Sequence, residues 1–397
     1  MALKFVDEID LKGKRVIARF DFNVPLSKDG TKQITDTTRV DCALPTIKHI
    51  LDKGATKLII MSHLGRPDGE RNMKYSLEPV AKYLSQKLEM DVVLTESCTD
   101  AGIKSLLNLD KNKIILLENL RFHPEEEDNN REFAKTLSSY ADVYVNDAFG
   151  TAHRKHASTY EINAFFKGKA VGGFLLKKEI DALNNVVENP KHPFVAIVGG
   201  AKVADKIKII ERLLTNVDKM IIGGAMAYPF LKAQGHKVGS SLCSETDVDL
   251  AKKILASSTG SKIVLPVDHV ISTGTEGQPE AVNSMDIPDG KMGLDIGNRT
   301  LDNYKSILST SKTVLWNGPM GYFENKAFAK GTFEVAKLLA QLNGAFTLVG
   351  GGDSVSAVTK AGVADKLSHV STGGGASLEY IEQGSLPGIQ ALKFGIE

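Results

Sequence analysis

Charged side chains follow the apolar runs in the first half of the sequence. Guanidinium groups bind carboxylates and phosphates through paired, charge-assisted hydrogen bonds, each contributing about 1.5–3 kcal/mol. A single arginine or asparagine in such a place is usually a surface or capping residue, but its repetition after several runs indicates a site for a small, multiply charged anion. The residues predicted to form this anion site are Asp21, Asn23, Arg39, His63, Arg66, Arg121 and Arg154.

Glycine-rich loops follow the apolar runs in the second half. Glycine lets the backbone approach a ligand closely, and its N–H groups can bind anions. One such loop is usually only a tight turn, whereas several of them after apolar strands predict a nucleotide site. The loops are VGGAK (198–202), IGGAMA (222–227), NGPMGYFE (317–324), VGGGDS (349–354) and STGGGAS (371–377).

Two lysines and one carboxylate could serve that nucleotide site. Lys202 and Lys206 in GGAKVADK lie about one helical turn apart and share a face. They are either solvated lysines or phosphate contacts, and the double glycine before them favours phosphate contact. Asp353 either caps the helix that follows it or holds Mg²⁺ on the nucleotide phosphates. The loop around Asp353 is not a P-loop, since it lacks the lysine of G-x-x-x-x-G-K-[ST].

A histidine pair and an acidic run raise the question of a metal site. His153 and His156 in TAHRKHAS could both face one ion, but Arg154 and Lys155 between them would repel a cation. We therefore interpret this segment as a contact to the anion. The acidic run PEEEDNN (124–130) has no EF-hand spacing around it and is interpreted as a solvated loop.

Length and composition predict a soluble globular protein of two domains. A length of 397 residues exceeds what one core supports, and a net charge of +1 gives no electrostatic reason to bind nucleic acid or an anionic membrane. No apolar run approaches the roughly 18 residues of a membrane span, and acids near the N-terminus argue against a signal peptide, so the cytoplasm is expected. Cys42, Cys98 and Cys243 form no zinc or disulfide pattern and are interpreted as reduced.

The elements that must position these residues are buried parallel strands alternating with helices. Runs that are apolar throughout, such as FVAIVGG, fit strands covered on both faces. Amphipathic segments at 76–89 and 130–140 lie between such runs, which predicts a βαβ architecture of the α/β class. Ligands then gather at the carboxyl ends of the strands. Residues 174–189 are predicted to form one amphipathic helix, which PKHP ends before the next strand.

Taken together, these motifs resemble the phosphoglycerate kinase family, in the family's order and over nearly the whole chain. The motifs are RFDFNVP, SHLGRP, LENLRF, AHRKHAS, GGAKVADKI, MGLDIG, LWNGPMGYFE, GGGDS and STGGGASLE. The resemblance implies two Rossmann-like three-layer domains with parallel sheets, joined by a hinge helix. The implied parts are a phosphoglycerate-binding domain (1–173), the hinge helix (174–189), a nucleotide-binding domain (190–378) and a tail returning to the first domain (379–397).

The resemblance also implies an activity. It is reversible phosphoryl transfer between 1,3-bisphosphoglycerate and ADP, giving 3-phosphoglycerate and ATP in glycolysis and gluconeogenesis, with Mg²⁺ carried as Mg-ADP or Mg-ATP. The enzyme would be a cytoplasmic monomer, acting on small molecules, whose two lobes close about the hinge and exclude water.

The roles implied for single residues follow from the same resemblance. The residues of the anion site would hold the phosphoglycerate, and Arg39, Lys202, Gly352 and Gly375 would stabilise the transferring phosphoryl group. Asp353 would position Mg²⁺. The nucleotide would be held by Gly200, Lys202, Lys206, Gly223, Gly224, Gly293, Asn317, Glu324, Gly351, Gly352, Asp353 and Ser354.

The sequence departs from the commonest family pattern at a few positions, and two other classes of protein compete with this interpretation. The departures are Phe20, Ala225, Pro229 and Ser354, of which Ser354 keeps the hydroxyl of the usual threonine. A dinucleotide-dependent dehydrogenase would need G-x-G-x-x-G with an acid about 20 residues on, and no glycine loop has that pattern. A two-lobed anion-binding protein without catalysis would not need Lys202, Asp353 and Glu324 together.

Overall fold

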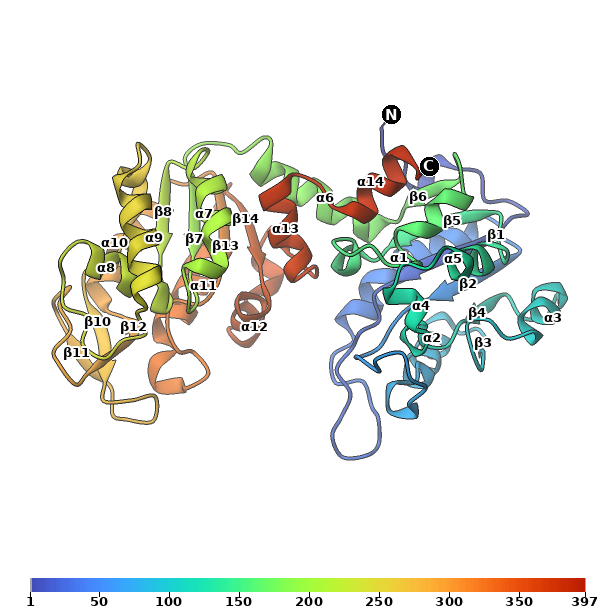
Figure 1. The fold of residues 1–397 in the computed structure, drawn as a ribbon, viewed down its shortest axis with the longest axis horizontal. Coiled ribbons are helices and arrows are strands. Elements are labelled where there is room, and N and C mark those ends of the chain that lie inside the picture. Colours follow the sequence, from blue (N-terminus) through green and yellow to red (C-terminus); the bar gives the residue numbers. More distant parts are fainter. Residues whose placement is uncertain (1, 397) are drawn as a thin grey trace. The chain divides into compact units, whose positions relative to one another are not determined.

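The computed structural model describes residues 2–396 and divides into two compact units (Figure 1). The first unit contains the residues up to Ile180 together with those from Ser385 on, and the second contains Asp181–Gly384. The division falls inside helix α6 (Phe174–Val187), which is the amphipathic segment predicted at 174–189. The other two amphipathic predictions also form helices, α2 (Glu78–Leu88) and α5 (Arg131–Ser138).

A six-stranded parallel sheet forms the first unit, in the order β3-β4-β2-β1-β5-β6. Ile17 of β1 pairs with Ile59 of β2 on one side and with Tyr144 of β5 on the other. The chain therefore builds outward from β1 in both directions, and such a reversal opens a crevice at the carboxyl ends of the central strands. The strands are β1 (Arg15–Phe20), β2 (Lys57–Met61), β3 (Val92–Leu94), β4 (Ile114–Leu116), β5 (Val143–Asp147) and β6 (Ala170–Gly172).

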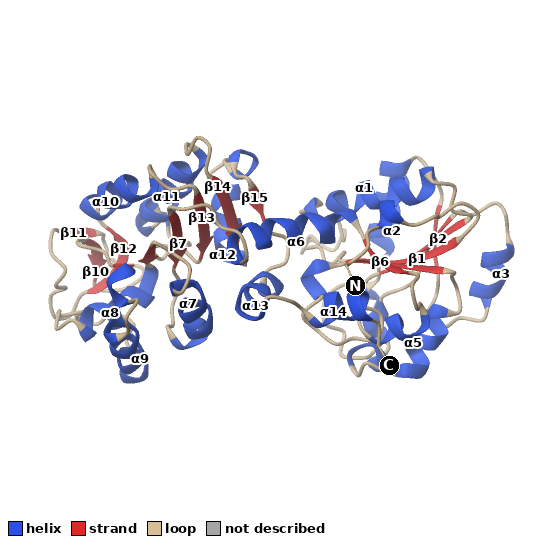
Figure 2. Ribbon diagram, turned by 90° about the horizontal axis from the view of Figure 1, so that it is seen from above, coloured by secondary structure: helices blue, strands red, loops and turns tan. Residues whose placement is uncertain are grey.

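Helices cover both faces of this sheet. Helices α1 (Thr38–Asp52) and α2 lie on one side, and α5 and α14 (Pro387–Phe394) on the other (Figure 2). On the α1 face, Val16, Ala18 and Phe20 of β1 pack with the buried side chains of α1 and α2. The remaining helices of the unit are α3 (Gly102–Asn108) and α4 (Pro124–Glu127). Burial on both faces explains why these strands are apolar throughout.

The second unit repeats the plan. Its six-stranded parallel sheet has the order β15-β14-β13-β7-β8-β9, and Trp316 of β13 pairs with Ile197 of β7 and Val349 of β14. Helices α10 (Asn298–Leu308) and α11 (Lys330–Ala340) lie on one side and α7 (Ile207–Leu214) and α13 (Gly375–Gln383) on the other (Figure 2). The strands are β7 (Phe194–Val198), β8 (Lys219–Ile222), β9 (Ile263–Val264), β13 (Thr313–Asn317), β14 (Phe346–Gly350) and β15 (His369–Val370). Helices α8 (Ala227–Ala233), α9 (Glu245–Ala256) and α12 (Gly352–Lys360) complete the unit. The predicted α/β class with two parallel-sheet domains is confirmed.

Two features differ from the sequence-based expectation. A three-stranded antiparallel sheet, β11-β10-β12, is present in the second unit, formed by β10 (His269–Ser272), β11 (Glu280–Val282) and β12 (Met292–Ile296). The C-terminal segment SLPGIQALKFGIE is less regular in sequence, and its Pro-Gly pair predicts a tail packed on other structure. It belongs to the first unit, but most of it forms a regular helix, α14. Proline is well tolerated in a first helical turn, where its missing N–H has no partner to lose, and Pro387 is the first residue of α14.

Candidate functional site

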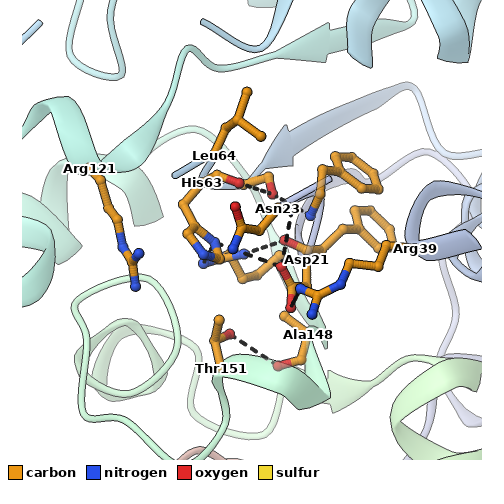
Figure 3. A network of polar contacts seen from close by, with 12 residues as sticks. Asp21, Asn23, Arg39, His63, Leu64, Arg121, Ala148 and Thr151 are labelled. Atoms are coloured by element: carbon orange, nitrogen blue, oxygen red, sulfur yellow. Dashed lines mark hydrogen bonds and ion pairs between the residues drawn. The ribbon is translucent and has the colours of Figure 1, made fainter. Parts of the chain in front are cut away.

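The first unit carries a polar cluster at the ends of β1 and β2, centred on Asp21 (Figure 3). The carboxylate of Asp21 accepts a hydrogen bond from Arg39 Nη1 at 2.6 Å, and its other oxygen lies 3.9 Å from His63 Nδ1. Asn23, next in the same loop, accepts a hydrogen bond from the N–H of Gly65 at 2.8 Å. The loops after two neighbouring strands are thus tied together.

Charge and burial set the protonation states in this cluster. Burial acts to raise the pKa of Asp21, but the charges of Arg39, His63 and Arg19 hold it below its usual value. Burial lowers the pKa of His63 well below its usual value, with Asp21 opposing the shift and the nearby arginines adding to it. At neutral pH the site therefore contains an ionised Asp21 and a neutral His63.

Arg121 joins the cluster, whereas Arg66 and Arg154 do not. Arg121 is buried, and its guanidinium donates to the carbonyl of Gly65 at 3.0 Å. Arg66 is exposed, and Arg154 is exposed with its Nε 3.3 Å from His153 Nε2. Neither exposed arginine forms an ion pair with residues 2–396, so both are available to an incoming anion.

Arginines lie near the histidine segment TAHRKHAS. The described residues 2–396 contain no group of three or more His, Cys, Asp or Glu placed to hold a metal ion. Burial, together with Arg121, Arg19 and Arg154, lowers the pKa of His156 to about 3. The acidic run interpreted as solvated is partly buried, because Glu126 of α4 turns inward and accepts a hydrogen bond from Ser158 Oγ at 2.6 Å.

In the second unit, a pocket of about 260 Å³ opens between the glycine loops. It includes predicted nucleotide residues from loops far apart in the sequence, namely Gly200, Gly224, Gly293, Glu324 and Asp353. Apolar side chains that the sequence did not single out form much of the wall. The remaining lining residues are Ala201, Ala225, Tyr228, Leu242, Thr275, Met292, Leu294, Pro319, Gly321 and Tyr322.

Lys206 is fixed beside this pocket, where the sheet order reverses between β7 and β13. Its ammonium group donates to the carbonyl of Gly199 and to Asn317 Oδ1, each at 2.6 Å. Asn317 in turn donates to the carbonyl of Gly350 at 2.8 Å, which links the ends of β7, β13 and β14. Burial lowers the pKa of Lys206 to about 8, although Asp353 and Asp205 oppose the shift. A buried ammonium at such a switch point is well placed to bind phosphate.

Steric contacts explain why glycine occupies two positions at this edge of the sheet. Gly351 precedes α12 with φ of +88°, and a side chain there would press on the amide nitrogen of Asn317. A side chain at Gly293 would collide with the hydroxyl of Tyr228 in the pocket wall. Ser354 is buried, and its hydroxyl accepts a hydrogen bond from the N–H of Gly318 at 2.6 Å, so it holds two glycine loops together.

The other predicted residues of the second unit lie at helix starts, on the surface or in the core. Gly352 and Gly375 begin helices α12 and α13, so their N–H groups have no intrahelical partner. Asp353 lies in the first turn of α12, which has Gly351 at its N-cap and no side-chain cap, and its carboxylate accepts no hydrogen bond from the described residues. Lys202 and Glu324 are exposed, and Gly223 is buried behind the pocket.

Known proteins resemble this chain over nearly its whole length. The family model of phosphoglycerate kinase matches residues 6–384. The chain belongs to the phosphoglycerate kinase family. A phosphoglycerate kinase of Anaeromyxobacter sp. (strain Fw109-5) is 53% identical over 400 residues, covering 99% of this chain and 100% of that protein. The phosphoglycerate kinase of Borrelia hermsii is 49% identical over 398 residues, with the same coverage.

Solved phosphoglycerate kinases share the fold. The structure from Coxiella burnetii has a TM-score of 0.88 at 38% identity and covers 99% of this chain and 98% of that chain. The structure from Pyrococcus horikoshii OT3 has a TM-score of 0.83 at 31% identity, with 99% of each chain covered. As a phosphoglycerate kinase, the protein is a phosphotransferase of glycolysis that uses a nucleotide and acts on small molecules. No helix among residues 2–396 is long and apolar enough to span a membrane.

The departures from the usual phosphoglycerate kinase pattern have separate consequences. Ala225 lines the pocket, whereas Pro229 is buried in α8 and does not line it. Phe20 stacks on Phe22 with ring centroids 5.5 Å apart, so it belongs to the core beneath the anion site. One residue close to the anion site was not predicted, namely Arg19. Arg19 carries the only charge inside the apolar run VIARF, and this charge was the signal that could have identified the residue.

Proposed function

We propose that this chain transfers a phosphoryl group reversibly between 1,3-bisphosphoglycerate and ADP, giving 3-phosphoglycerate and ATP. The observation that carries the proposal is the position of Lys206. Its ammonium group is hydrogen-bonded to Gly199 and Asn317 beside the pocket between the glycine loops, at the switch point of the second sheet. Nucleotide binds there in this proposal. The phosphoglycerate binds at the Asp21 cluster of the first unit, where arginines and a neutral histidine surround one carboxylate.

The acceptor explains which catalytic groups are needed. The attacking oxygen of 3-phosphoglycerate belongs to a carboxylate, which is already ionised at neutral pH. No general base is required, unlike phosphoryl transfer to a hydroxyl group. Catalysis then consists of aligning the two ligands and neutralising charge on the transferring group. A site made of arginines, lysines and glycine N–H groups fits that requirement.

We assign the transferring phosphoryl group to Arg39, Lys202, Gly352 and Gly375. Arg39 lies at the start of α1 with its side chain 35% exposed, and Lys202 is exposed in the loop after β7. Gly352 and Gly375 offer N–H groups at helix starts, where both the unpaired donors and the helix dipole favour anions. The substrate roles of Arg66, Arg121 and Arg154 belong to the same proposal.

The residues present fit Mg²⁺ carried on the nucleotide. Magnesium binds oxygen, keeps several waters and usually takes one or two carboxylates beside the phosphates. Asp353 supplies one exposed carboxylate at the wall of the pocket, and this carboxylate accepts no hydrogen bond from the residues that the structure describes. When bound, Mg²⁺ would neutralise phosphate charge.

Asp353→Asn is expected to weaken the magnesium dependence specifically. Loss of the charge should raise the Mg²⁺ concentration for half-maximal rate by about tenfold, as one charge-assisted contact is worth about 1.5 kcal/mol. The measurement is a magnesium titration at fixed ADP. Asp365→Asn, at an exposed aspartate shortly after α12, is the matched control. An unchanged titration would support a purely structural role for Asp353.

The activity itself is tested by a coupled assay. Purified protein with ATP and 3-phosphoglycerate should form an acyl phosphate, read by coupling to glyceraldehyde-3-phosphate dehydrogenase. The rate should depend on both substrates. Absence of acyl phosphate formation with folded protein would contradict the proposal.

We further propose a cytoplasmic monomer whose first domain (1–173) binds phosphoglycerate and whose second domain (190–378) binds nucleotide. Helix 174–189 would act as the hinge and residues 379–397 as the returning tail. The family membership and the division into two compact units support this assignment. Sedimentation equilibrium tests the monomer.

A further inference from the structure

Arg19 is a fully buried arginine next to the anion site. It lies on β1 with no exposed surface. Its Nε donates to Ser158 Oγ at 3.0 Å, its Nη1 donates to the carbonyl of Phe20, and its Nη2 lies 3.2 Å from His63 Nδ1. Each nitrogen of the guanidinium therefore has a protein partner. Arg19 acts on a ligand only through a neighbouring residue.

A buried carboxylate, that of Glu126, is connected to Arg19 through Ser158 and balances its charge. Ser158 donates through Oγ to Glu126 Oε1 at 2.6 Å and through its N–H to Oε2 at 2.9 Å. Glu126 is also fully buried. A buried arginine and carboxylate bridged by a serine form a satisfied network, which holds the guanidinium in one position.

This position determines where His63 carries its proton. An arginine side chain only donates hydrogen bonds and stays protonated in proteins. Nδ1 of His63 must therefore accept, which requires that it carry no proton. The neutral ring then has its proton on Nε2, and Nε2 forms no hydrogen bond with the described residues.

We propose that Arg19 is a positioning residue that fixes His63 as the neutral Nε2–H tautomer, so that His63 presents a hydrogen-bond donor to the bound phosphoglycerate. The inference rests on the proposed function for the identity of the ligand. It assigns the cationic role at this site to arginines alone, which keep their charge at every physiological pH. Binding of the anion then does not depend on protonation of His63.

Other charged groups near His63 also influence which of its nitrogens carries the proton. Asp21 follows β1, Arg39 is on α1, and Arg121 is in the short helix η3 (Leu120–Phe122). Asp21 is the competitor, since it would favour a proton on Nδ1. At 3.9 Å, however, its oxygen is beyond hydrogen-bond distance from that nitrogen, whereas Arg19 is within it. The three arginines all oppose a positive ring.

The first experiment determines the tautomer of His63 in the natural protein. Nitrogen-15 NMR of the ligand-free protein reports the tautomer of each of the nine histidines, and His63→Gln assigns the His63 signals. We expect a proton on Nε2, none on Nδ1, and no titration between about pH 5.5 and 8.5. A proton on Nδ1, or a titration midpoint inside that range, would overturn the inference.

Variants then test whether Arg19 is the cause. In Arg19→Met combined with Glu126→Gln, which leaves no unpaired buried carboxylate, no donor faces Nδ1, and the proton should be found on Nδ1, the nitrogen nearer to Asp21. Arg15→Met, at a half-buried arginine on the same strand, is the matched control and should leave His63 unchanged. A retained Nε2–H tautomer in the double variant would refute the role of Arg19.

Adding 3-phosphoglycerate to the natural protein separates this inference from the proposed function. A shift of the His63 Nε2 proton signal on binding supports both. The expected tautomer without any response to 3-phosphoglycerate would instead contradict the ligand assigned to this site.

Discussion

Arg39→Ala is expected to lower kcat by about 10²–10³-fold, the usual effect of removing one preorganised group that stabilises transition-state charge. In the free protein Arg39 is held by Asp21 at 2.6 Å, so its guanidinium is oriented before substrate arrives. Because the pocket for the nucleotide belongs to the other compact unit, the Kd for ADP should change by less than about twofold.

Steady-state kinetics and ADP titration of the Arg39→Ala protein measure both quantities. Arg131→Ala is the matched control, since Arg131 also forms a 2.6 Å ion pair, with Glu161, but lies 56% exposed on α5. Its kcat should be unchanged. An Arg39→Ala protein with near-normal turnover would remove Arg39 from the catalytic assignment.

Lys206→Met is expected to have the largest effect on nucleotide binding. A charge-assisted contact worth about 1.5–3 kcal/mol corresponds to a loss of about 10- to 150-fold in affinity for ADP. Calorimetric titration checks this value. Lys208→Met, in the same segment but exposed, should bind ADP normally. Equal affinities in the two variants would show that Lys206 serves the fold and not the ligand.

The same lysine predicts a pH dependence. Its pKa of about 8 means that affinity for ADP should fall as pH rises above 8, because the free protein then loses the ammonium charge. This decline should be absent in Lys206→Met. The stability effect has the opposite sign: an unfolded lysine binds protons up to about pH 10.5, so the contribution of Lys206 to folding rises with pH between about 8 and 10.5.

The parallel sheets could be predicted from the sequence because burial on both faces leaves a strong signal. A run such as FVAIVGG is apolar at successive positions, and its strand β7 is buried along its whole length. The antiparallel sheet could not be predicted in this way. Its strand β11 is mostly exposed, and β10 has an irregular register between Val270 and Ile271. A strand as short and exposed as β11 leaves little periodicity.

The candidate site was predictable where strand ends carry the chemistry, as for Asp21 and Asn317. It was not predictable where the contribution comes from the packing of distant segments. Leu242 and Tyr322 are exposed apolar residues that line the pocket, and exposed apolar residues occur on every protein surface. Arg19 appeared as part of a strand, and its role became visible only through its contact with His63.

Helix α14 has a consequence for the order in which the protein is made. The first unit consists of the residues up to Ile180 and those from Ser385 on, and α14 supplies buried residues to it, with the N–H of Gly388 bonded to the carbonyl of Ala152 at 2.9 Å. During synthesis on the ribosome, the whole of the second unit emerges before this last helix does. The half of the chain translated first is therefore the half completed last, and its apolar surface under α14 stays open until then.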